Sequence, residues 1–296
     1  MEQPGSLQHI PAFISYLEFE KRYSGHTLRS YHDDLQQFDE FMRKEYGSVP
    51  DTEIKPALIR SWLVSLKEQE MTAKTLNRKL SSLRSYYRFL LKKRHISHNP
   101  LLQVTAPKIS RRLPVFVEQQ DMETLLKDVE FTNDREGRMR HLILLFFYHT
   151  GTRLSELIHI KTADVDYQRF SLKVLGKGNK ERIIPLTPAL ATAIKNYLDD
   201  FPSGSSYLFH KDDGKKLYPA YVYKLVRNEL GKVTTIKKKS PHVLRHSFAT
   251  HLSNNGAELN AIKELLGHAS LAATQVYTHN SIEKLKEIHA KAHPKS

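Results

Sequence analysis

One segment of this 296-residue chain has the two-residue period of a β-strand, whereas most of its other patterns are helical. "FSLKVL" (170–175) alternates apolar and polar side chains, "GKGNK" (176–180) has the residues of a turn, and "ERIIPL" (181–186) returns. The sequence therefore predicts a mainly α protein with a small antiparallel β-sheet, and a hairpin with lysines at its tip.

The first hundred residues have the patterns of four helices. "TLRSYHDDLQQFDEFM" (27–42) places its apolar residues at helical spacing, and Pro56 suits the first turn of the helix "KPALIRSWLVSL" (55–66). We expect a helical domain over residues 1–107.

The fourth of these helices, residues 72–93, is strongly two-faced. Leu76, Leu80, Leu83, Tyr87 and Leu90 form one apolar stripe, which should face the core. The opposite face has the chemistry to lie against DNA phosphates. Its predicted DNA-binding residues are Lys74, Arg78, Arg84, Arg88 and Lys92.

A break in the pattern follows this helix. Residues 99–114 contain three prolines, several cations and no strong period, which is typical of a linker. We place the linker at 108–114 and a second domain at 115–296.

Composition indicates a polyanionic partner. The chain has 46 basic and 32 acidic residues, a net charge of +14, and no Asp or Glu between Glu70 and Glu118. It has no cysteine, which excludes disulfides and thiolate chemistry and favours the cytoplasm. No apolar run approaches the roughly 20 residues of a membrane span, so no membrane role is expected.

The segment 240–277 concentrates reactive side chains. Ser240 and Pro241 predict a helix start, with the serine hydroxyl as cap, and Asn255-Gly256 predicts its end. His242 and Arg245, three residues apart, share one edge near the positive end of this helix, a place that suits an anion. His268 directly follows a second helix stop at Gly267, and Tyr277 comes nine residues later.

A metal site is the alternative use of these histidines. His242, His246 and His251 have roughly helical spacing, but a cation there would lie beside Arg245 without a nearby acid to offset the repulsion. We therefore predict no metal, and interpret His246 and His251 as structural histidines.

Five ordered motifs carry a family resemblance over nearly the whole chain. "TGTRLSEL" (150–157), "GKGNKER" (176–182), "HVLRHSFATHL" (242–252), "LLGHASLAATQVYTH" (265–279) and the ending "HPKS" resemble those of tyrosine site-specific recombinases, in particular the Xer group. The resemblance implies a helical core-binding (SAM-like) DNA-binding domain before an α+β catalytic domain.

The resemblance also implies the catalytic residues, matched motif by motif. They are Arg153, Lys177, His242, Arg245, His268 and Tyr277, with Lys180 as an alternative to Lys177. The implied reaction cuts and rejoins double-stranded DNA at paired short sites through a 3′-phosphotyrosine, with no cofactor. A Xer-type function further implies chromosome dimer resolution at a dif-like site, a homo- or hetero-tetramer with a second recombinase, and an FtsK-like translocase.

Other functions stay open at this point. A mobile-element or phage integrase and a type IB topoisomerase share this chemistry, and a DNA-binding protein with a decayed centre would lack part of it. The last segment, "NSIEKLKEIHAKAH" (280–293), has too narrow an apolar face to be stable alone, so we expect it to dock, in such recombinases into a neighbouring protomer as a subunit-exchange helix.

Overall fold

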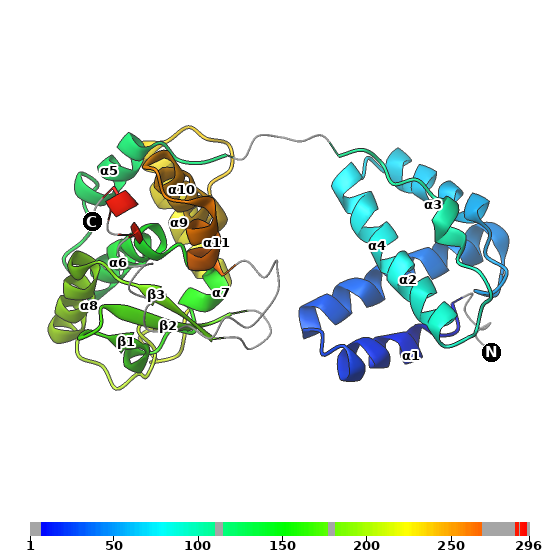
Figure 1. The fold of residues 1–296 in the computed structure, drawn as a ribbon, viewed down its shortest axis with the longest axis horizontal. Coiled ribbons are helices and arrows are strands. Elements are labelled where there is room, and N and C mark those ends of the chain that lie inside the picture. Colours follow the sequence, from blue (N-terminus) through cyan, green and yellow to red (C-terminus); the bar gives the residue numbers. More distant parts are fainter. Residues whose placement is uncertain (1–6, 110–114, 177–180, 268–287, 290, 295–296) are drawn as a thin grey trace. The chain divides into compact units, whose positions relative to one another are not determined.

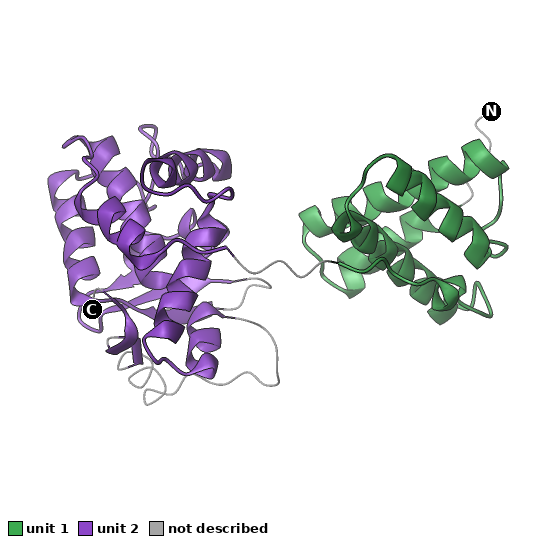
Figure 2. Cartoon of the chain, turned by 90° about the horizontal axis from the view of Figure 1, so that it is seen from above, with its two compact units in different colours: residues 1–112 green, residues 113–296 purple. Residues whose placement is uncertain are grey.

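The computed structural model describes residues 7–109, 115–176, 181–267, 288–289 and 291–294. The chain divides into two compact units, residues 1–112 and 113–296 (Figures 1 and 2). The division falls inside the segment 108–114 that the sequence indicates as a linker.

Unit 1 is helical, as predicted. Its elements are α1 (Ile10–Ser15), which continues as a π-helical turn (Tyr16–Glu20), then α2 (Gly25–Tyr46), α3 (Pro56–Glu68), α4 (Ala73–Lys92) and a short 3-10 helix (Pro100–Gln103). Thr72 caps α4, because its hydroxyl accepts a hydrogen bond from the Thr75 amide at 3.3 Å. The predicted apolar stripe of α4 is buried over its whole length in the core of this unit.

Unit 2 combines helices with a small sheet. Its helices are α5 (Gln119–Lys127), α6 (Arg135–Thr150), α7 (Leu154–Leu157), a 3-10 turn (Thr162–Asp164), α8 (Pro188–Asp200), α9 (Pro219–Val233), α10 (Pro241–Asn254) and α11 (Leu259–Leu266). The strands β1 (Val165–Asp166), β2 (Ser171–Leu175) and β3 (Glu181–Pro185) pair antiparallel in that order. The predicted hairpin is confirmed, with Ser171 opposite Pro185 and Leu175 opposite Glu181. The two-residue β1 is too short to leave a pattern in the sequence.

Helix α6 forms the centre of unit 2 and packs against α8 and α10. The predicted start and end of α10 are confirmed, with Pro241 in its first turn and Gly256 at φ +86° after its end. The predicted cap is wrong in one respect: Ser240 is the N-cap residue, but its buried hydroxyl makes no hydrogen bond to any residue that the structure describes. None of the described helices is long and apolar enough to cross a membrane.

The end of the chain packs on unit 2. Ile288 and Ala292 contact the small core between α10 and α11. The side-chain Nδ2 of Asn255 donates to the Ala292 carbonyl at 2.8 Å. His289 and His293 bond the carbonyls of His149 and Tyr148 at the end of α6, at 2.8 and 3.1 Å. These residues therefore dock on their own chain. The start of the predicted exchange helix, residues 280–287, lies outside the described residues.

Candidate active site and DNA-binding surface

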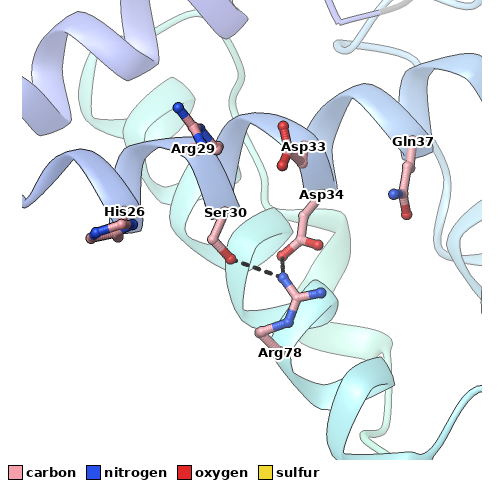
Figure 3. Close-up of a pocket in the computed structure, with 7 residues that line it drawn as sticks. All are labelled: His26, Arg29, Ser30, Asp33, Asp34, Gln37 and Arg78. Atoms are coloured by element: carbon pink, nitrogen blue, oxygen red, sulfur yellow. Dashed lines mark hydrogen bonds and ion pairs between the residues drawn. The ribbon is translucent and has the colours of Figure 1, made fainter. Parts of the chain in front are cut away.

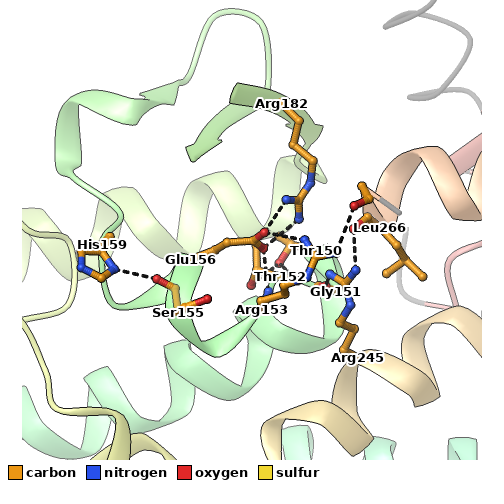
Figure 4. A network of polar contacts seen from close by, with 11 residues as sticks. Thr150, Gly151, Thr152, Arg153, Ser155, Glu156, His159, Arg182, Arg245 and Leu266 are labelled. Carbon is orange, nitrogen blue, oxygen red and sulfur yellow. Dashed lines mark hydrogen bonds and ion pairs between the residues drawn. The ribbon is translucent and has the colours of Figure 1, made fainter. Parts of the chain in front are cut away.

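Arg245 is buried on α10 and binds backbone rather than side chains. Its two terminal nitrogens donate to the carbonyls of Gly151 and Leu266, which end α6 and α11 (Figure 4). Gly151 has a left-handed backbone (φ +57°), and a Cβ there would lie 2.5 Å from the Phe248 ring. The glycine of "TGTRLSEL" thus lets the end of α6 approach α10 and receive Arg245.

Arg153 reaches the same place from the other side. It precedes α7, and its Nη2 donates to the Gly267 carbonyl at 3.0 Å while its Nη1 donates to Glu156 Oε1 at 2.7 Å (Figure 4). The two predicted arginines therefore converge on adjacent carbonyls, Leu266 and Gly267, at the C-terminal end of α11. Each guanidinium has five N–H groups, so both keep donors for a ligand.

This convergence leaves positive charge in a confined place. Burial, together with the like charge of Arg153, lowers the pKa of Arg245 to about 9, so the side chain remains a cation at neutral pH. The helix-end carbonyls offset only part of that charge. The arrangement suits a ligand with two negatively charged oxygens, such as a phosphodiester.

Glu156 and Arg182 are two site residues that the sequence analysis missed. Glu156 is buried at the centre of the network, and Arg182 of β3 forms a two-fold ion pair with it, at 2.5 and 2.8 Å (Figure 4). Burial alone would raise the pKa of Glu156, but the hydrogen bonds and charge of Arg182 and Arg153 outweigh it and hold that pKa below its usual value. The sequence signal that could have identified Glu156 was its position three residues after Arg153, which is the spacing of a capping box.

The remaining predicted catalytic residues are only partly described. His242 is exposed on α10, one turn before Arg245. Lys177, with Lys180, and His268 and Tyr277 lie outside the described residues. In the sequence, Lys177 comes between β2 and β3, and His268 directly follows Gly267.

The other two histidines of α10 have structural surroundings. His251 is buried, and its Nδ1 lies 2.8 Å from the Tyr148 hydroxyl. His246 is half-buried, and burial lowers its pKa. Within the described ranges, no three His, Asp or Glu side chains are grouped so that they could hold a metal ion.

The predicted DNA-binding residues of α4 differ in their exposure and in the hydrogen bonds and ion pairs that they form within unit 1. Lys74, Arg88 and Lys92 are exposed, whereas Arg84 is half-buried and donates to the Val104 carbonyl at 3.0 Å. Arg78 is half-exposed, forms an ion pair with buried Asp34 and donates to the Ser30 hydroxyl at 3.0 Å. Arg84 thus also fixes the segment after the 3-10 helix.

A hollow beside Arg78 extends this surface to α2. It is lined by His26, Arg29, Ser30, Asp33, Asp34, Gln37 and Arg78, and Figure 3 shows Arg78 directed at Ser30 and Asp34. His26 and Arg29 are exposed on α2 and were missed by the sequence analysis, because the same helix also contains Asp33 and Asp34. Cations from two helices therefore adjoin one hollow.

Comparisons with known proteins identify the class. A model of the phage integrase family matches residues 116–284, and a model of the phage integrase N-terminal SAM-like domain matches residues 10–94. Tyrosine recombinase XerC of Staphylococcus epidermidis is 37% identical over 288 residues (96% of each chain). That of Pelobacter propionicus is 39% identical over 293 residues (98% of this chain and 96% of the relative).

Solved structures share the fold at lower identity. XerH site-specific recombinase bound to a palindromic difH substrate has a TM-score of 0.70 and 22% identity, covering 94% of this chain and 83% of that one. The Tn1549 transposon integrase in complex with transposon right end DNA has a TM-score of 0.72 and 19% identity, covering 95% and 99%.

The fold, the arginine pair and the curated relatives define this protein as a tyrosine recombinase, an enzyme that cuts and rejoins DNA. The chain belongs to the phage integrase family.

Proposed function

We propose that this recombinase acts in the cytoplasm on the chromosome, and resolves chromosome dimers by exchanging strands between two short dif-like sites. Full-length relatives that are named XerC support the Xer type over a mobile-element integrase. The observation that carries the chemical proposal is the convergence of Arg153 and Arg245 on the end of α11, immediately before His268.

In the proposed reaction the Tyr277 hydroxyl attacks a DNA phosphodiester. The new bond joins the tyrosine oxygen to phosphorus, and the bond to the 5′ sugar oxygen breaks. Arg153 and Arg245 donate to the non-bridging oxygens, where negative charge grows in the transition state, and His268 adds a further donor. The 3′-phosphotyrosine conserves the phosphodiester bond energy, so rejoining needs no ATP.

Proton transfer completes the step. The departing 5′ oxygen is a poor leaving group unless it is protonated, and Lys177 in the hairpin turn is the proposed donor. His242, one turn before Arg245 on α10, is the proposed acceptor for the tyrosine proton.

The proposed assembly is a tetramer, of this chain alone or with a second recombinase, on two DNA sites and under an FtsK-like translocase. The tail could link its subunits if residues 280–293 dock in a neighbour. Because Ile288, His289, Ala292 and His293 pack on their own chain, such an exchange requires these contacts to be released first.

A covalent trapping experiment tests this function. A nicked substrate that loses its 5′ fragment should leave wild-type protein attached to DNA, and Tyr277→Phe should abolish the adduct while binding is retained. Tyr223→Phe is the matched control, because this exposed tyrosine belongs to the same domain. An adduct that persists in Tyr277→Phe would contradict the assignment.

The substrate is tested separately. The purified protein should select one chromosomal fragment with a short, partly palindromic site, and should recombine two copies of it. Relaxation of a plasmid that lacks the site, by a monomer, would instead indicate a type IB topoisomerase.

A further inference from the structure

We propose that Arg182 is a positioning residue for DNA cleavage, which acts through Glu156 and Gly267 to hold the guanidinium of Arg153. The inference rests on the proposed role of Arg153 in binding the phosphate. It assigns a task to a buried arginine whose two terminal nitrogens are both paired with a carboxylate.

The Glu156 carboxylate is fully used by two arginines. Its Oε1 accepts from Arg182 Nη1 at 2.5 Å and Arg153 Nη1 at 2.7 Å, while its Oε2 accepts from Arg182 Nη2 at 2.8 Å and the Arg153 amide at 2.7 Å. A carboxylate offers about four acceptor positions, so this one has none left. Glu156 therefore has one orientation, and both arginines determine it.

The two arginines differ in what they can reach. The side chain of Arg153 is 34% exposed and that of Arg182 is 6% exposed. Both terminal nitrogens of Arg182 face Glu156, and its Nε is buried without a hydrogen bond to any described residue. Burial alone does not separate the roles, because Arg245 is equally buried. Both terminal nitrogens of Arg182 are paired with an anionic carboxylate, whereas those of Arg245 meet only neutral carbonyls.

Arg182 also contacts the second anchor of Arg153. A Cβ on Gly267 would lie 2.8 Å from the Cδ of Arg182, so the stem of Arg182 packs directly on the Gly267 backbone. The Gly267 carbonyl is the group that receives Arg153 Nη2. One side chain thus supports both groups that fix the Arg153 guanidinium, and loss of that support allows the small displacement that lowers the rate of an oriented reaction.

Arg182 further connects this anchor to the lysine hairpin. It lies on β3, one residue after the strand begins at Glu181, and the turn with Lys177 directly precedes that strand. Arg182 could therefore act through Lys177 instead of Arg153, and the two routes predict different responses to a changed leaving group.

The experiment compares Arg182→Met with wild type in single-turnover cleavage with saturating protein over DNA, with DNA affinity and thermal unfolding measured in parallel. Methionine keeps the apolar stem but cannot donate to Glu156. We expect cleavage to fall by about 10²-fold, the scale of a displaced catalytic group, with little change in DNA affinity. Arg182→Lys should fold and retain the charge, but one ammonium cannot hold both carboxylate oxygens, so cleavage should fall by about 10-fold.

The matched control is Arg140→Met. Arg140 pairs with Glu229, another fully buried carboxylate of the same unit, at a different part of the fold. This control should show the loss of stability that follows removal of an arginine from a buried acid, with unchanged cleavage.

Two further measurements identify the route. In an Arg153→Ala background, Arg182→Met should have almost no additional effect on cleavage, because the guanidinium that Arg182 positions is already absent. A substrate with sulfur as the bridging 5′ atom, whose leaving group needs no proton, should rescue Lys177→Ala but not Arg182→Met.

Three results would overturn the proposal. The first is cleavage by Arg182→Met within about threefold of the Arg140→Met control. The second is rescue of Arg182→Met by the sulfur substrate. The third is a double variant whose loss of cleavage rate equals the product of the losses in Arg153→Ala and Arg182→Met. If Arg153→Ala itself cleaves normally, the proposed function fails. If Arg153→Ala is inactive and Arg182→Met is normal, only the positioning role fails.

Discussion

Each unit of this protein contains a buried carboxylate that holds two basic side chains, and the two clusters have different surroundings. In unit 1, Asp34 binds Arg78 and Lys79 between α2 and α4, and the Ser82 hydroxyl donates to it at 2.8 Å. In unit 2, Glu156 binds Arg153 and Arg182. In both, one cation is enclosed and the other reaches the surface.

The difference lies in what else fixes the exposed cation. Arg78 is 49% exposed, and besides Asp34 it contacts only the Ser30 hydroxyl among the described polar groups. Arg153 is tied to a backbone carbonyl as well as to its acid, and neighbouring Arg245 is tied to two. The second partner of Arg78 is a hydroxyl that can rotate, which suits adjustable contacts along DNA, whereas catalysis needs donors that are fixed before charge develops.

The largest effect should come from Lys177. The cleavage rate without this lysine shows how much the arginine donors contribute without a proton donor. Lys177→Ala removes the proposed proton donor and should slow cleavage of ordinary DNA by about 10²–10⁴-fold. Substitution of sulfur for the 5′ bridging oxygen should restore cleavage, as measured by single-turnover gels. Restoration of Lys180→Ala but not of Lys177→Ala would show that the two lysines have exchanged roles.

The fixed geometry of the arginine pair Arg153 and Arg245 can be disrupted without removal of its charge. Arg245→Lys keeps a cation but cannot donate to both Gly151 and Leu266, so we expect cleavage to fall by about 10²–10³-fold with nearly unchanged DNA affinity. Arg227→Lys, at an exposed position on α9, is the control. Normal cleavage by Arg245→Lys would mean that charge alone suffices there, and the contrast between the clusters would disappear.

The cluster of unit 1 should prove mainly structural when its acid is removed. Asp34→Ala leaves Lys79, which is 3% exposed, as an uncompensated buried charge, and should lower the free energy of unfolding of unit 1 by about 3–5 kcal/mol. Trp62 is the single tryptophan of the chain and lies in this unit, 5.9 Å from the Lys79 ammonium, so its fluorescence follows unit 1 alone.

Asp33→Ala changes the exposed neighbour and should have little effect on stability. An equal loss in both variants would indicate general electrostatics rather than a buried ion pair.

Local patterns predicted much of this structure, because each depends on neighbours in sequence. The period of residues 72–93, the turn "GKGNK" and the stop at Gly267 specify α4, the β2–β3 hairpin and the end of α11. The motifs likewise identified Arg153 and Arg245, which the structure brings together.

The contacts across the fold could not be predicted in this way. The pairing of Arg182 with Glu156 spans 26 residues and that of Asp34 with Lys79 spans 45, and neither has a local pattern. Arg84 and Arg88 look equivalent on a helical projection, yet only Arg84 is committed to the distant Val104 carbonyl. Burial and partner choice are set by packing, which residue spacing does not encode.

A smaller effect should separate the two kinds of surface cation on α4. Arg88→Ala removes an exposed arginine, and should weaken DNA binding and reduce the slope of log affinity against log salt by about 0.9 for each phosphate that the protein no longer neutralises. Lys67→Ala on α3 removes an equally exposed cation outside the predicted surface, and serves as the control.

Arg84→Ala should weaken binding by a different route, because it also frees the segment at Val104. Equal salt slopes in wild type, Arg88→Ala and Lys67→Ala would show that this face of α4 does not bind phosphates.

The smallest effect concerns a third buried group of side chains, in unit 2, which contains neutral histidines and no carboxylate. His293 stacks on both His289 and His149, with ring centroids 5.0 and 4.4 Å apart, and the Tyr148 hydroxyl lies 2.8 Å from His251 Nδ1. Burial lowers the pKa of His289, so its neutral form is the docked one.

Once released, His289 should have a pKa of about 6.5 and bind protons more readily than when docked. Docking of residues 288–289 and 291–294 should therefore be independent of pH well above 6.5 and weaken as the pH falls below it, by at most about tenfold per pH unit for each histidine that gains a proton. Hydrogen exchange at the His293 amide, which donates to the His289 carbonyl at 2.8 Å, measures this opening. His289→Gln keeps a donor for the His149 carbonyl but cannot titrate. The change of the docking equilibrium with pH should therefore be smaller by the contribution of one proton. An unchanged slope would assign the titration to His149 or His293, and a flat wild-type profile would mean that the tail stays docked whatever the charge on its histidines.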